Sequence, residues 1–66
     1  MEEIDVWRTA SVLIKLHGDQ AALFAAARAD ELFAANDFVG SAVFHRIVLA
    51  IMELERTKPR EGEAMN

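Results

Sequence analysis

Apolar residues recur every three or four positions along three segments of this chain, the spacing of helices that bury one side. The segments cover about residues 2–16, 20–35 and 38–57, the first starting at Glu2 or Glu3. Nowhere do β-branched and polar residues alternate for long enough to indicate a strand. The pattern therefore predicts an all-α fold, a compact three-helix unit.

Each expected helix has a side that we predict to face the core, taking about 100° per residue. In the first segment that side carries Ile4, Trp7, Ala10, Ser11 and Ile14, with Val6, Leu13 and His17 at its edge. In the second it carries Ala22, Ala25, Ala29 and Leu32, flanked by Ala21, Ala26 and Phe33. In the third it carries Val43, Phe44, Ile47, Val48, Ile51 and Leu54, with Ala50 at its edge. Because the second side is mostly alanine, the tryptophan and the third segment must supply most of the core volume.

The residues between the segments are typical of helix ends. Gly18 is expected to end the first helix with a positive φ, and Asp19 to cap the second. Asn36 is expected in the left-handed conformation, followed by Asp37 as the cap of the third helix. Gly40 costs about 1 kcal/mol relative to alanine inside a helix, so we expect another backbone to approach closely there.

Three polar residues of the first two segments have expected partners. Ser11, on the predicted core side, is expected to hydrogen-bond to its own helix. Arg28 lies near the apolar side of its helix, where it is expected to pair with an acid such as Glu3 or Asp37. His17 stands at a helix end, where an imidazole can interact with the last carbonyl groups.

The third segment has a second apolar side, opposite Ile47, which we call the outer stripe. It consists of Phe38, Ala42, His45, Leu49 and Met52, with Arg56 in line beyond them. Steps of four and three residues make such a stripe able to receive another helix. We therefore predict a protein-interaction surface, with His45 as one of its polar members. The alternative is that the third helix lies between the other two and has no outer side.

The length of the chain strengthens the case for association. A domain of 66 residues is near the lower limit for independent folding, where disulfides, a structural metal or oligomerisation commonly help. The chain has no cysteine and only two histidines, so neither a disulfide nor a metal site built from these ligands is expected. Homodimerisation through the third helix is the remaining aid, and we predict it.

Charge and patterning also exclude several classes of function. A net charge of −4 argues against direct binding to nucleic acid or to an anionic membrane. The start, MEEIDVWR, lacks the features of a signal peptide, and no uncharged run is long enough to span a bilayer. We expect a cytoplasmic protein with a three-helix domain over residues 1–57 and a polar, disordered tail over 58–66.

The chain shows none of the common catalytic or cofactor-binding motifs. It lacks a cysteine nucleophile, a Gly-x-Ser-x-Gly turn, a phosphate-binding glycine loop and a His-Glu-x-x-His pair. The acidic pairs Asp30–Glu31 and Glu53–Glu55 are typical of solvated helix faces. We therefore expect no enzyme activity, no cofactor and no metal.

Three stretches, VWRTASVLIKLHGDQA, ARADELFAANDFVGSAVF and HRIVLAIMEL, together resemble a family of small alphaproteobacterial proteins with a domain of unknown function. The resemblance covers about residues 6 to 57 and rests on Trp7, His17, Gly18, Arg28, Asp30, Asp37 and Gly40. Asn36 replaces the first glycine of the family's Gly-Asp-x-x-Gly turn, and Phe44 replaces a tryptophan. The resemblance implies a fold and carries no activity.

Two functions fit these observations. The first is a non-enzymatic interaction module that self-associates or binds a helix of a partner protein of unknown identity. The second is a small acidic regulator or inhibitor that acts on a protein complex handling nucleic acid, without touching the nucleic acid itself.

Overall fold

The computed structural model describes residues 2–57 of the 66-residue chain. Three α-helices make up this part: α1 (Glu3–His17), α2 (Ala21–Ala34) and α3 (Phe38–Thr57). A short 3-10 turn, η1 (Gly18–Gln20), joins α1 directly to α2. The described residues contain no strand, so the predicted all-α class is confirmed. The expectation for the tail from Lys58 onward lies outside the described residues.

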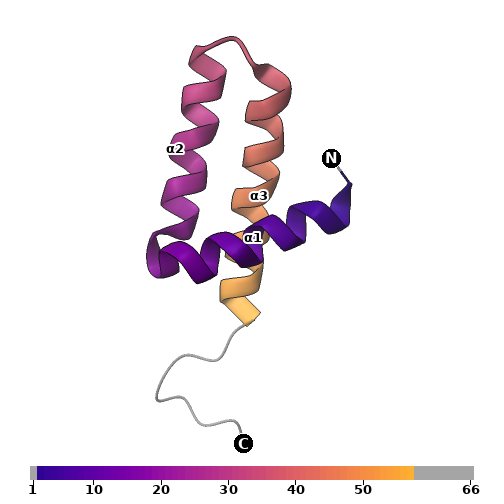
Figure 1. Ribbon diagram of the computed structural model, residues 1–66, viewed down its shortest axis with the longest axis vertical. Helices are drawn as coiled ribbons and strands as arrows, with labels where there is room; N and C mark the ends of the chain where they lie inside the picture. Colours follow the sequence, from indigo (N-terminus) through magenta and orange to yellow (C-terminus); the bar gives the residue numbers. More distant parts are fainter. Residues whose placement is uncertain (1, 58–66) are drawn as a thin grey trace, which may run out of the picture.

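Helices α2 and α3 form an antiparallel hairpin, and α1 lies across its open end at a steep angle (Figure 1). No loop separates α1 from α2, because η1 follows α1 and precedes α2 directly; the two can also be counted as one long helix bent sharply at Gly18, with α3 as a second helix. The sequence predicted two similar turns between separate helices. Only the turn before α3 is of that kind.

The corner between α1 and α2 is formed by a glycine and an aromatic contact. Gly18 has φ 56° and ψ −127°, and its N–H donates to the carbonyl oxygen of Ile14. The positive φ was predicted. The predicted cap at Asp19 is wrong, because this residue lies inside η1 and α2 has no side-chain cap. The ring of His17 stacks on Phe24 across the corner, with centroids 4.3 Å apart.

The turn before α3 agrees with the prediction at both of its residues. Asn36 has φ 66°, and the Oδ1 atom of Asp37 accepts a hydrogen bond of 2.9 Å from the N–H of Gly40. The prediction that another backbone approaches Gly40 closely is wrong. A Cβ atom there would lie 2.6 Å from Oδ2 of Asp37, so the capping side chain itself occupies the space.

The core is small and rich in alanine. Its buried apolar residues are Val6, Ala10, Leu13, Ala21, Ala25, Ala29, Ile47, Ala50 and Ile51. The predicted core sides of α2 and α3 are thus confirmed at their centres, and Trp7 packs half-buried against the cluster as expected. Small residues let the helices approach closely, but they bury little apolar area each.

The buried side of α1 is rotated relative to the prediction. Val6 and Leu13, expected at the edge, are buried, whereas Ile4 and Ser11, expected at the centre, are exposed. Because α1 crosses the hairpin, it buries only the strip that faces the crossing. The hydrogen bond expected from Ser11 to its own helix is not formed. Instead, the hydroxyl group of Thr9 donates such a bond to the carbonyl oxygen of Asp5, at 2.8 Å.

Candidate functional site: the outer stripe of α3

The outer stripe is exposed along its whole length. Phe38, Ala42, His45, Leu49 and Met52 are all exposed, with Phe38 and Met52 each 54% accessible and Leu49 65%. The alternative in which α3 lies between the other helices without an outer side is therefore wrong. Both α1 and α2 pack against the side of α3 that carries Ile47 and Ile51, which are fully buried.

The stripe continues onto α2 at the turn before α3. The rings of Phe33 and Phe38 meet edge to face, with centroids 5.0 Å apart, and both remain exposed. The sequence placed Phe33 beside the core of α2, so its part in this surface was missed. The available signal was its position five residues before Phe38, across a turn that brings the two helix ends together.

The described residues expose far more large apolar side chains than they bury. Exposed are Ile4, Val12, Leu16, Leu23, Phe24, Phe33, Phe38, Val39, Leu49 and Met52. The largest fully buried side chains are two isoleucines, Ile47 and Ile51. Single exposed apolar residues are common on monomeric proteins, but a continuous row of them usually marks an interaction surface.

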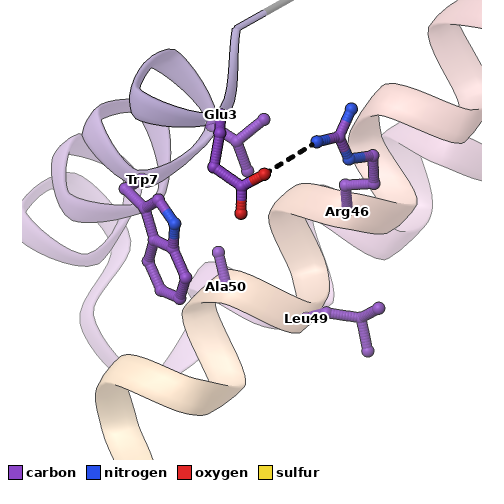
Figure 2. Close-up of a pocket in the computed structure, with 6 residues that line it drawn as sticks. Glu3, Trp7, Arg46, Leu49 and Ala50 are labelled. Atoms are coloured by element: carbon purple, nitrogen blue, oxygen red, sulfur yellow. Dashed lines mark hydrogen bonds and ion pairs between the residues drawn. The ribbon is translucent and has the colours of Figure 1, made fainter.

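A shallow recess lies between α1 and α3, at the edge of the stripe. Glu3, Val6 and Trp7 line it from α1, and Arg46, Leu49 and Ala50 line it from α3. Figure 2 shows Ala50 directed toward α1 and Leu49 directed away from it. The recess holds about 190 Å³, below the roughly 300–1,000 Å³ of typical small-molecule pockets. It suits a side chain of a protein better than a metabolite.

Ion pairs border the stripe. The Nη2 atom of Arg46 lies 3.4 Å from Oε1 of Glu3, which ties α1 to α3 beside the recess, and Arg56 pairs with Glu53. These side chains are largely exposed, so each pair adds little to stability, about 0.2–1 kcal/mol.

Arg28 has a different partner from the two that were predicted. Its Nη1 atom lies 3.0 Å from Oε1 of Glu31, one turn along α2, and not near Glu3 or Asp37. Arg8 makes the same kind of short-range pair with Asp5, at 4.0 Å. The four described pairs thus engage the carboxylates of Asp5, Glu3, Glu31 and Glu53.

Metal-ligating side chains do not cluster in the described part of the chain. Among residues 2–57, no three His, Cys, Asp or Glu side chains are grouped so as to hold a metal ion. No buried polar side-chain atom in the same part lacks a hydrogen-bond partner. The principal surface feature of these residues is therefore apolar.

No helix within residues 2–57 is both long enough and apolar enough to cross a bilayer.

Comparison with protein-family models, with curated proteins and with solved structures finds no match to this chain. The resemblance to a small alphaproteobacterial family thus stays an expectation from the sequence.

Proposed function

We propose that this protein is a non-enzymatic helical interaction module that self-associates as a homodimer through the outer stripe of α3. The observation that carries the proposal is the row of exposed large side chains on α3, set against a core whose members are mostly alanine. Fully burying Phe38, Leu49 or Met52 would each contribute about 1.5–3 kcal/mol. A second copy would supply the apolar contact that the small core lacks.

The same face could receive a helix of a different protein, but a second copy needs nothing beyond the residues of this chain. Self-association also uses every stripe residue twice, which suits a domain with little stability of its own. The acidic-regulator function has less support, because mimicry of nucleic acid requires rows of unpaired carboxylates. Here Asp5, Glu31, Glu3 and Glu53 are each engaged by an arginine.

Sedimentation velocity tests the proposal with a matched pair of variants. The wild type should sediment as a dimer at micromolar concentration. Leu49→Asp should be a folded monomer, because Leu49 is outside the core and its charge would have to be buried in the dimer. Leu23→Asp introduces the same charge at a leucine of nearly equal exposure, 67% against 65%, on α2, and should remain dimeric. So should Glu55→Gln.

A wild type that stays monomeric at high concentration would show the proposal to be wrong, whatever the variants do. Loss of the dimer in both leucine variants would instead place the contact on a different or larger surface. Circular dichroism of each variant separates loss of association from loss of helix.

A further inference from the structure

We propose that the second copy lies antiparallel on α3, with Phe38 against the partner's Arg56, Ala42 against the partner's Met52 and His45 against the partner's Leu49. This inference rests on the proposed self-association and specifies its geometry. It derives from the spacing of the stripe, from the volumes of its side chains and from its charges.

The spacing of the stripe is the same from either end. From Phe38 to Arg56 the steps are four, three, four, three and four residues. A helix running in the opposite direction, with the two-fold axis passing α3 at the level of Ile47, therefore places every stripe position opposite another stripe position. At about 1.5 Å per residue, the paired length is about 27 Å, nearly the whole of α3.

The volumes are complementary only in the antiparallel arrangement. The small side chain of Ala42 meets the long, flexible one of Met52, which can fill the space that alanine leaves. Interdigitation of large and small residues is what a closely packed contact requires. A parallel pair would place alanine against alanine and leave a gap beside two apposed phenylalanines.

The charges favour the same direction. In the antiparallel pair, the guanidinium group of Arg56 lies near the exposed ring of Phe38, where a cation is attracted to the face of an aromatic ring. The exposed Phe33, which touches Phe38, extends that aromatic platform. In a parallel pair, Arg56 would lie beside its own copy and away from both phenylalanine rings, so this attraction would be absent.

Residues beside the stripe near the two-fold axis do not prevent this pairing. Arg46 comes close to its own copy there, but each guanidinium group has the carboxylate of Glu3 at 3.4 Å. Leu49 borders the recess beside α1, but its side chain points away from that helix and stays exposed (Figure 2).

Disulfide trapping distinguishes the two directions. The chain has no native cysteine, so Ala42→Cys and Met52→Cys each introduce a single thiol. When the two variants are mixed in a thiol redox buffer, the antiparallel pair should give mainly the mixed covalent dimer. Each variant alone should cross-link at least tenfold more slowly, because residue 42 lies about 15 Å along the axis from its own copy. Mass spectrometry identifies the species, and Leu23→Cys is the control that should not cross-link.

Self-linked dimers forming as fast as the mixed dimer would overturn the antiparallel pairing while leaving self-association intact. So would a protein that sediments as a dimer but forms no cross-link at either position. A monomeric wild type would remove both proposals together.

A second variant tests the direction without thiols. Arg56→Gln should weaken the dimer about five- to thirtyfold if Arg56 faces the partner's phenylalanine, because the contact occurs twice in a two-fold dimer. In a parallel pair Arg56 would not face the ring, so an unchanged or lower dissociation constant would overturn the proposal. Arg28→Gln breaks an ion pair of the same spacing on α2 and should leave the dissociation constant unchanged.

Discussion

At the residue scale, the start of α3 depends on the side chain of Asp37, which caps the helix and occupies the place that a Cβ atom on Gly40 would take. The carboxylate of Asp37 accepts the Gly40 N–H at 2.9 Å, and a Cβ on Gly40 would lie 2.6 Å from its other oxygen. Gly40→Ala should therefore gain about 1 kcal/mol of helix propensity and lose a similar amount of capping, with little net change. Asp37→Ala should cost about 1 kcal/mol.

The test is a double-mutant cycle, measured by urea unfolding at one protein concentration. In the Asp37→Ala background, Gly40→Ala should raise the free energy of unfolding by about 1 kcal/mol, because no carboxylate is left for the new Cβ atom to displace. If the effects of the two substitutions are strictly additive, the Asp37 side chain makes room for a Cβ atom at position 40 without losing its capping hydrogen bond.

At the element scale, the bounds of the helices were predictable and their packing was only partly so. The predicted ends lie within one residue of α1, α2 and α3, because periodicity and turn residues act locally. The prediction placed the buried side of α1 wrongly, because whether Ile4 or Val6 is covered depends on how α1 crosses the hairpin. Asp19 was misassigned because the chain continues through a 3-10 turn that needs no side-chain cap.

The bend between α1 and α2 carries its own prediction, at Gly18. Its φ of 56° with ψ of −127° is a conformation that residues with a Cβ adopt only at a cost of about 1–3 kcal/mol. A Cβ atom added there would meet no other atom within 4 Å, so the whole cost of Gly18→Ala is backbone strain. We expect the free energy of unfolding to fall by about 1–3 kcal/mol in urea titrations. Asn36→Gly, at the other positive φ, should cause no loss; equal stability of Gly18→Ala and the wild type would contradict this account.

At the scale of the whole molecule, the exposed stripe could be predicted from the sequence, but its extent could not. Helical spacing was enough to place Phe38, Leu49 and Met52 opposite Ile47, and the structure leaves all three exposed. The contribution of Phe33 and the small size of the core depend on how the helices meet, which periodicity does not encode.

A homodimer whose folding and association are coupled should melt at a temperature that depends on protein concentration. A tenfold change in concentration alters the free energy of unfolding by about 1.4 kcal/mol per dimer, which corresponds to about 5 °C in the thermal midpoint for two chains of this size. Circular dichroism melts between 2 and 200 µM, roughly two tenfold steps, should therefore span about 10 °C for the wild type and for Leu23→Asp. Leu49→Asp should melt lower and at one temperature throughout, because nothing associates. A wild-type midpoint that does not move with concentration would mean that the alanine-rich core is sufficient by itself, and that the stripe serves some contact other than a second copy.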